Sequence, residues 1–496
     1  MSRPPLGPSW LGLVAAVVAG VALAGLGGWL TFHRLEVSGA ASDEIVYVRS
    51  AQAYLRGDFS ANPEHPPLGK WIIALGLRPG LEGQELLGAA RLPVALLGWL
   101  TGVVTAATAG LITRRLVPAL AAGGLWWLLP GTAGSPHHLV RVAMLDGPMM
   151  FFVSLSLLLC VLAWRTRQLR WWPLAAASAG LAAATKVPGV VALLGLAPVV
   201  VTALVRPAAA AARPKVLLAV LGCGVVAAVS FLATYLPAGG GAAAWARETF
   251  AFQLDHAADG HPVEIAGRVV TDSPWWAAWW WQARYLTWPG VAVLWGLAVV
   301  GLLRWGRRGA WVVGAPLLAG TLALAVSPLQ LPHYHLVLTP MLCVAAAAAL
   351  AAPRSPAGVP GDGARTGVAT RRAAAAVSVA SALALLVLAP TVVQHAAAVA
   401  RTTGSPFAAA EQELRARGLQ NATLTVWSDP FAAKWYLPHH PRTGRSPAPD
   451  GVAIVNESYA RRRGFPLEQW CAAECALRER VDLGGLTLYL PLHGIP

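Results

Sequence analysis

Side chains suited to acid–base and phosphate chemistry gather in the first hundred residues of the chain. Asp43 and Glu44 follow an apolar stretch, and about twenty residues later the segment from Asn62 to Lys70 reads NPEHPPLGK. A carboxylate held near a hydroxyl group, in a site of restricted water, acts as a general base. Asp43 is therefore the candidate base, with Glu44 beside it.

Three cations and a further acid lie between residues 70 and 186. Lys70, Arg91 and Lys186 are candidates for neutralising a phosphate, because lysine and arginine are the usual phosphate partners in proteins. Asp146 stands at the start of an apolar run. A phospholipid-linked donor entering sideways from a bilayer would present the phosphate that these cations need.

Oxygen and imidazole ligands for a divalent metal ion are also available. Glu64 and Asp146 supply carboxylates, and either His256 or His261 supplies an imidazole.

Each of these residues also has a plainer interpretation. Asp43 and Glu44 would suit the start of a helix beside the membrane, where acids serve as caps. Single histidines are often solvated loop residues. Lys186 and Arg141 would serve as headgroup anchors. The joint placement of the set on one face of a membrane favours a functional site.

The composition requires a solvent other than water. The chain has 496 residues, of which 56% are hydrophobic and 12% charged, and its mean hydropathy is +0.55. These values exclude an ordinary soluble domain, a disordered chain and collagen. The net charge of +15 would suggest nucleic acid in a soluble protein. The chain must therefore be an integral membrane protein. In such a protein the positive charge marks the loops that face the cytoplasm, so no nucleic-acid partner is expected.

Eleven uncharged runs of about the length that spans a bilayer predict a polytopic α-helical protein. They lie near residues 9–30, 92–112, 117–131, 147–164, 172–185, 187–205, 216–236, 289–303, 310–326, 335–352 and 373–396. Alternate loops are rich in arginine, which places the N-terminus in the cytoplasm and the C-terminus outside the plasma membrane.

Three segments lie outside the membrane in this topology. They are outer loops at 33–91 and 237–288, and a tail at 401–496. The tail alternates helix-like stretches at 408–417 and 466–480 with β-like runs at 423–427, 452–455 and 486–490, which predicts a small α/β domain after a transmembrane domain at 1–400.

Two smaller features belong to the outer segments. The tryptophan-rich stretch 275–288 is either an interfacial belt helix or a sugar-stacking surface. Cys471 and Cys475 would pair in an oxidising compartment, although an i, i+4 spacing on a helix is near the upper limit of disulfide geometry.

The motifs of the first two hundred residues resemble those of protein O-mannosyltransferases and their bacterial relatives, including the lipid A aminoarabinose transferases. Asp43-Glu44 followed by the run HPPLGK at 65–70 is similar to the first motif of that superfamily. The segment RVAMLDGPMMFF at 141–152 is similar to its second acidic motif, and GLAAATKVPG at 180–189 to its lysine segment. These are GT-C membrane glycosyltransferases that use polyprenyl-phosphate sugars.

The resemblance implies roles for individual residues. Asp43 would be the base or the acceptor-positioning carboxylate, and Asp146 would support the active centre. Lys70, Arg91 and Lys186 would contact the donor phosphate. His65, Arg141 and Tyr334 would contact substrate, the last within the motif PHYH at 332–335. Glu64 aligns with a metal-associated glutamate of the aminoarabinose branch, and His256 would be the second-loop histidine.

The predicted function is transfer of a sugar from a polyprenyl-phosphate donor to an acceptor on the outer face, with inversion at the anomeric carbon. The acceptor is a protein Ser or Thr or a glycolipid, because the HPPLGK motif favours the mannosyltransferase branch whereas the C-terminal domain favours the lipid-modifying branch. The alternative is a transporter or flippase of lipid-linked sugars, which would place charges at mid-span and repeat one half of the chain. A third possibility, an anchor presenting the tail, leaves the first-loop cluster without a role.

Overall fold

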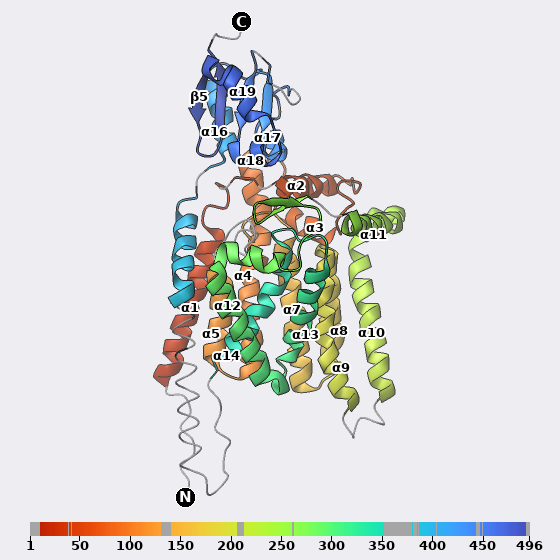
Figure 1. Ribbon diagram of the computed structural model, residues 1–496. Helices are drawn as coiled ribbons and strands as arrows, with labels where there is room; N and C mark the ends of the chain where they lie inside the picture. The colour runs from red at the N-terminus through yellow and green to blue at the C-terminus, as the bar shows by residue number, and fades with distance from the viewer. Residues whose placement is uncertain are drawn as a thin grey trace, which may run out of the picture.

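The computed structural model describes residues 10–37, 39–40, 42–129, 140–205, 213–259, 262–351, 379, 384, 386–402, 404–442, 447–448 and 450–492. A bundle of apolar helices makes up most of it, and the tail forms a separate unit standing on one end of the bundle (Figure 1). His261, one of the two candidate histidine ligands, lies outside the described residues.

Six helical segments are long and apolar enough to cross a membrane: Trp10–Phe32, Gly83–Thr113, Asp146–Thr166, Val187–Val205, Arg213–His256 and Ala277–Arg308. Four shorter apolar helices accompany them: Leu116–Leu128, Trp311–Val326, Tyr334–Ala349 and Leu386–Ala400. Helices are the expected form for such runs because lipid cannot satisfy backbone N–H and C=O groups. The chain is therefore a multi-pass membrane protein, as its composition predicts.

The bundle is built from the following elements in chain order: α1 (Trp10–Phe32), α4 (Gly83–Thr113), α5 (Leu116–Leu128), α7 (Asp146–Thr166), α8 (Trp171–Thr185), η1 (Val187–Gly195), α9 (Leu196–Val205), α10 (Arg213–Leu232), α12 (Ala277–Trp305), η4 (Gly306–Arg308), α13 (Trp311–Val326), η5 (Tyr334–Leu338) and α14 (Thr339–Ala349). Buried side chains of these helices form one continuous apolar core.

Small residues bring the helices of the bundle close together. A Cβ at Gly301 of α12 would lie 1.9 Å from the carbonyl oxygen of Ala345 on α14, and one at Gly180 of α8 would lie 2.3 Å from that of Ala227 on α10. Such close backbone approach is common where helices pack in a membrane, because packing rather than hydrophobicity drives their association.

Two helical segments are interrupted, one at Lys186 and one at Thr287. The helix α8 ends at Thr185, Lys186 is extended (φ −156°, ψ 130°), and the 3-10 turn η1 begins at Val187. In α12 the backbone breaks at Thr287 (φ 62°), two residues before Pro289. The predicted tryptophan-rich stretch and the predicted span 289–303 are therefore one helix with a kink, because proline cannot continue the hydrogen-bond ladder.

Three helices lie across the end of the bundle below the tail unit. They are α2 (Ser42–Leu55) and α3 (Leu68–Ala74) from the predicted first loop, and α11 (Ala242–Asp259) from the second, reached through η3 (Ala233–Gly241) (Figure 1). A two-stranded hairpin, β1 (Val263–Ile265) and β2 (Arg268–Val270), follows α11.

The tail folds around a four-stranded sheet in the order β3-β4-β6-β5. The strands are β3 (Leu424–Trp427), β4 (Val452–Val455), β5 (Arg478–Asp482) and β6 (Thr487–Pro491), and only the β3–β4 pair is parallel. The helices are α16 (Pro406–Ala416), α17 (Pro430–Tyr436), α18 (Glu457–Arg462) and α19 (Leu467–Glu474), followed by η6 (Cys475–Leu477). Two clusters of buried apolar side chains lie within this unit.

One predicted element of the tail is wrong. The stretch 466–480 was expected to be a single helix, but α19 ends at Glu474 and Arg478 begins β5. Residues 478–482 pair antiparallel with β6, so tertiary pairing outweighs their helical tendency. Cys471 and Cys475 form a disulfide with a Cα–Cα distance of 4.4 Å, because the helix gives way to a 3-10 turn at the second cysteine.

The close contact between α12 and α14 gives a direct test of the fold. We expect Gly301→Ala to lower the stability of the detergent-solubilised protein by about 1–3 kcal/mol, because the new methyl group has to displace backbone. Gly296→Ala on the same helix is the matched control, since nothing lies within 4 Å of a Cβ there. Thermal denaturation would measure both variants, and equal melting temperatures would contradict the helix packing.

Candidate active site

A buried ion pair lies where the bundle meets the helices that cross its end. Lys186 Nζ donates to both carboxylate oxygens of Asp146, at 3.0 and 3.1 Å, and the two side chains are 7% and 2% exposed. The break between α8 and η1 frees Lys186 from regular helix, and Asp146 opens α7, where the helix dipole favours an acid. The structure thus brings together two residues that are 40 positions apart.

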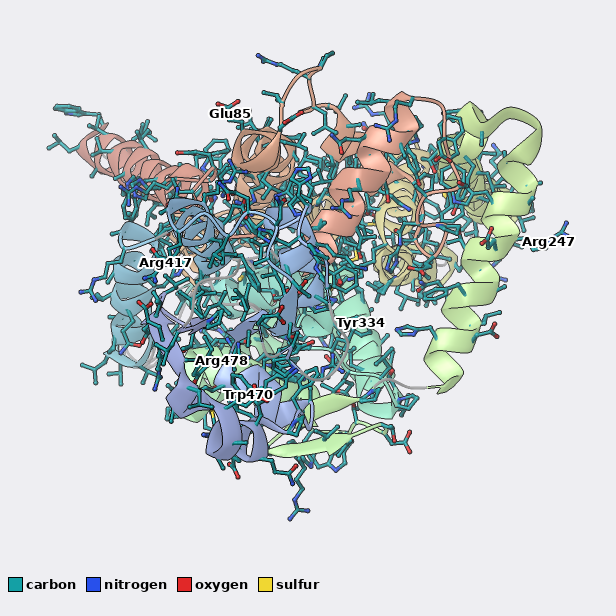
Figure 2. The ribbon with its side chains drawn as sticks, turned by 90° about the horizontal axis from the view of Figure 1, so that it is seen from above. Glu85, Arg247, Tyr334, Arg417, Trp470 and Arg478 are labelled. Atoms are coloured by element: carbon teal, nitrogen blue, oxygen red, sulfur yellow. A yellow bond between two sulfur atoms is a disulfide. The ribbon has the colours of Figure 1, made fainter. Side chains whose placement is uncertain are left out.

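Aromatic and imidazole side chains surround this pair. Lys186 Nζ lies 5.4 Å from the ring centroid of Tyr334, and the His333 ring meets the Tyr334 ring edge-on at 5.0 Å. Figure 2, seen from the end that carries the tail, places Tyr334 near the middle of the molecule. The late motif at 332–335 therefore reaches the same place as the two earlier motifs.

The N-terminal end of α2 brings Asp43 to the site. Asp43 is exposed in the first turn, whereas Tyr47, one turn later, is 3% exposed. Burial, together with the negative charges of Asp43, Asp146 and Glu64, raises the pKa of Tyr47 well above its usual value. Asp43 and Asp146 therefore act electrostatically on one phenol from two different elements.

Two histidines of the site are uncharged at neutral pH. Burial and the positive charge of Lys186 lower the pKa of His65 to about 3 and that of His333 to about 4. The His65 ring lies edge-on to Tyr47 at 5.7 Å, and its buried Nδ1 atom has no hydrogen-bond partner among the described residues. A buried imidazole nitrogen of this kind is able to bind a substrate group.

Glu44, next to Asp43, points the other way and is fully buried. Arg91 Nε donates to Glu44 Oε1 at 2.6 Å and Arg91 Nη2 to Glu44 Oε2 at 2.7 Å. The same guanidinium donates to the carbonyls of Leu35 and Gly39, and Glu44 Oε1 also accepts from Ala143 N–H. This bidentate pair joins four chain segments.

Lys70 and Arg141 are also committed to backbone acceptors. Lys70 is fully buried, and its Nζ donates to the carbonyls of Asn62 and His65 and to the Asn62 side chain. Arg141 donates to the carbonyls of Leu30 and His33 at the end of α1, where a helix leaves acceptors unsatisfied. In this structure Lys70 holds the first-loop motif in shape and Arg141 caps a helix.

The predicted metal ligands do not form a binding set. Glu64 is exposed and accepts from the Asn62 amide at 2.8 Å, and His256 stacks on Phe252 at 5.3 Å between ring centroids. Within the described ranges, no three His, Cys, Asp or Glu side chains gather as a metal would require. The donors that the described residues provide near Glu64 and His256 do not fit a resident metal ion.

The second outer segment supports the first. Thr249 Oγ1 of α11 donates to the carbonyl of Pro63 at 2.7 Å, and the Gln253 amide donates to that of Glu64 at 2.9 Å. The Phe252 ring also lies edge-on to His65 at 6.5 Å. The helix α11 therefore fixes the loop that carries His65.

The tail unit rests on the same scaffold. The hydroxyl of Tyr436 accepts from Ala40 N–H at 3.2 Å and donates to Gln84 at 2.9 Å. Arg49 of α2 donates to the carbonyl of Lys434 and lies 5.6 Å from the Trp435 ring. The end of α17 is thus held against α2 and the start of α4, above the site.

Part of the chain, which includes several residues of this site, matches a known protein family. Residues 64–234 match the model of the dolichyl-phosphate-mannose-protein mannosyltransferase family, and this segment holds Glu64, His65, Asp146 and Lys186. No curated protein matches the chain significantly. The resemblance predicted from the motifs is confirmed, and it supports a glycosyl-transfer role.

Solved structures extend the likeness over almost the whole chain. ArnT from Cupriavidus metallidurans, solved with bound undecaprenyl phosphate, is 18% identical, with 96% of this chain and 98% of that chain covered and a TM-score of 0.54. The oligosaccharyltransferase AglB from Archaeoglobus fulgidus, solved with an inhibitory peptide and a dolichol-phosphate, is 14% identical, with 92% and 68% covered and a TM-score of 0.51. At these identities the likeness is one of fold.

Two residues of the site were not singled out from the sequence. Tyr47 lies four positions after Asp43, so a helix beginning at Ser42 puts both on one face. His333 precedes Tyr334 in a motif that was recognised for its tyrosine alone. Both signals were present, but nothing in the sequence separates them from many other aromatic residues near a membrane surface.

The buried Glu44–Arg91 pair should be indispensable for folding. We expect Glu44→Gln to cost about 3–5 kcal/mol, because the guanidinium of Arg91 is left in a dry site without its counter-charge. Arg415→Gln is the control, since it removes a similar contact to Glu411 at 2.6 Å whose arginine is 63% exposed, and it should cost under about 1 kcal/mol. Thermal denaturation in detergent would measure both, and comparable losses would show that the buried pair is not a structural link.

Proposed function

We propose that this protein transfers a sugar from a polyprenyl-phosphate donor to an acceptor hydroxyl at the outer face of the plasma membrane. The observation that carries the proposal is the convergence of Asp43, His65, Asp146, Lys186 and Tyr334 at one end of the bundle. Four chain segments with superfamily motifs supply these residues, and such gathering of ionisable groups beside membrane helices is costly unless it serves a function.

Asp43 is the base in this mechanism. Its position in the first turn of α2 leaves it exposed, so an acceptor reaches it from the aqueous side. The acceptor oxygen attacks the anomeric carbon while Asp43 takes the hydroxyl proton. The bond from that carbon to the phosphate oxygen breaks, and the polyprenyl phosphate leaves with the electron pair. A single displacement of this kind inverts the anomeric centre.

Lys186 is the cation that meets the donor phosphate. Of the three predicted phosphate ligands, only Lys186 lies beside the acidic and aromatic side chains of the site, whereas Lys70 and Arg91 are bonded to backbone and Glu44. Asp146 positions the ammonium group in the resting site. The buried Nδ1 of His65 supplies a further polar contact for the phosphate or the sugar. We assign Lys70, Arg91 and Arg141 to positioning roles.

The acceptor is a protein Ser or Thr or a glycolipid. The HPPLGK motif favours the former, and the tail unit above the site favours the latter. We infer from the arginine-rich loops that the N-terminus lies in the cytoplasm and the tail outside. The Cys471–Cys475 disulfide supports that side for the tail, because disulfides persist in oxidising compartments.

Asp43→Asn tests the assignment of the base. We expect transfer to fall by at least 10²-fold, in line with the loss of a general base, while expression and melting temperature stay unchanged because the side chain is exposed. Asp58→Asn is the matched control in the same outer segment, since Asp58 is exposed and bonded only locally to Ser60. Normal turnover by Asp43→Asn would overturn the proposal.

The same assay separates a transferase from a flippase. In detergent micelles there are no two leaflets, so a flippase has no measurable activity, whereas a transferase still converts donor and acceptor. Loss of lipid-linked sugar export in cells, with no transfer in micelles, would favour the flippase.

Metal dependence is measured in that assay with a chelator. Among the described residues, Glu64 and His256 do not belong to a group of three side chains that could hold a metal ion. We therefore expect full activity without divalent ions. Loss of activity that added metal restores would revive the predicted metal site.

A further inference from the structure

Five arginines converge at the end of the bundle opposite the tail unit. Arg114 follows α4, Arg165 and Arg167 end α7, and Arg307 and Arg308 lie in the turn between α12 and α13. Together with Ile112 and Trp164 they line a hollow of about 380 Å³. Three turns that are far apart in sequence thus direct guanidinium groups to one place.

The backbone of these turns fixes the arrangement. Arg114 and Arg167 close their helices in the left-handed region, at φ 55° and 57°, where glycine is the usual residue. Gly309, at φ 101°, packs so closely on Trp164 that a Cβ would lie 2.8 Å from the indole. The third turn is therefore held against the end of α7.

The chain segments that form the hollow contain no acidic side chain to balance these charges. The sequence contains no Asp or Glu in 86–145, 147–247 or 273–361, the stretches that supply every wall of the hollow. Arg165 donates to the carbonyl of Leu111, and within the described chain none of the five forms an ion pair. The positive-inside rule alone would spread arginines over all the loops at this end of the bundle, whereas these five arginines line one hollow.

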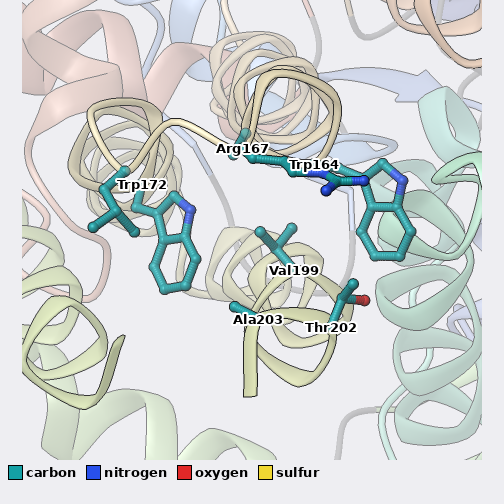
Figure 3. Close-up of a pocket in the computed structure, with 8 residues that line it drawn as sticks. Trp164, Arg167, Trp172, Val199, Thr202 and Ala203 are labelled. Carbon is teal, nitrogen blue, oxygen red and sulfur yellow. The ribbon is translucent and has the colours of Figure 1, made fainter. Parts of the chain in front are cut away.

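An apolar slot adjoins the hollow. It has a volume of about 90 Å³ and lies between the end of α7, the start of α8 and the helix α9. Figure 3 shows Trp164 and Trp172 on opposite sides of it, with Val199 between them and Arg167 along its upper rim. Trp164 and Arg167 line both spaces, so a strongly basic site passes directly into an apolar one.

We propose that the hollow and the slot bind an anionic phospholipid of the adjoining leaflet, with its phosphate on the arginines and part of an acyl chain in the slot. Guanidinium groups suit phosphate because they donate two parallel hydrogen bonds. Basic pockets between membrane helices are the usual sites of anionic lipid headgroups. The bound lipid would tie the ends of α4, α7 and α12 together at the end of the molecule away from the candidate active site.

The test is lipid binding by the full chain in detergent, measured by native mass spectrometry and by the rise in melting temperature. The probes are phosphatidylglycerol, phosphatidylcholine and inorganic pyrophosphate. We expect phosphatidylglycerol to bind at least tenfold more tightly than phosphatidylcholine. The double variant Arg307→Gln/Arg308→Gln should lose most of that preference, with about a tenfold weaker affinity.

A matched control has the same change in charge. Arg213→Gln/Lys215→Gln removes two exposed cations at the start of α10, at the same end of the bundle but outside the hollow, and should leave the affinity within about twofold. A third variant, Ala203→Phe, fills the slot and should weaken phosphatidylglycerol without changing pyrophosphate binding.

Three results would overturn the proposal. Equal losses in the two double variants would show that net charge alone attracts the lipid. Equal binding of phosphatidylcholine would remove the role of the anionic headgroup. Pyrophosphate binding as tight as that of phosphatidylglycerol would identify a soluble anion as the ligand. Because no outcome requires turnover, each is independent of the proposed glycosyl transfer.

Discussion

The buried pair of Glu44 and Arg91 is the interaction on which the outer end of the molecule depends. It is bidentate, it is shielded from water, and its remaining donors and acceptors are used by Leu35, Gly39 and Ala143. Removing either partner would leave an uncompensated charge in a dry site, so the four segments that it joins are held together. Asp43 directly precedes Glu44 in α2, so the anchoring of Glu44 also fixes the position of Asp43.

The candidate site follows from interruptions in regular structure. Lys186 reaches Asp146 because α8 stops at Thr185 and the chain runs extended for one residue. His65 reaches Tyr47 because Lys70 gathers the carbonyls of the loop before it, while α11 supports that loop from the other side. Irregular backbone near a membrane is stable only where it is bonded within the protein. The cations that provide this bonding donate to backbone carbonyls and to Glu44.

The two ends of the bundle carry charge in different ways. At the end below the tail unit, acids and cations occur together, and two buried ion pairs, Glu44–Arg91 and Asp146–Lys186, lie there. At the opposite end the arginines of the hollow lie on segments without acids, so an anion from outside these segments is needed to balance their charges. The first arrangement suits chemistry in a restricted site, and the second suits attachment to an anionic surface.

The sequence by itself determined the membrane class, most of the helices and the segments that carry the site. Long apolar runs cross a bilayer as helices, because the backbone groups have to be bonded within the segment. The sequence also shows on which segment each motif residue lies. It also placed Lys186 between two helical pieces, because Pro188 follows it. Tertiary structure alone decided which ionisable groups face one another. Pattern does not distinguish Glu44 from Asp43, or Lys70 from Lys186, because a charge becomes structural or functional only through the partners that packing brings within hydrogen-bond distance. Residues 478–482 became a strand because they pair with β6, which follows them directly in the chain, and this pairing outweighs their helical tendency.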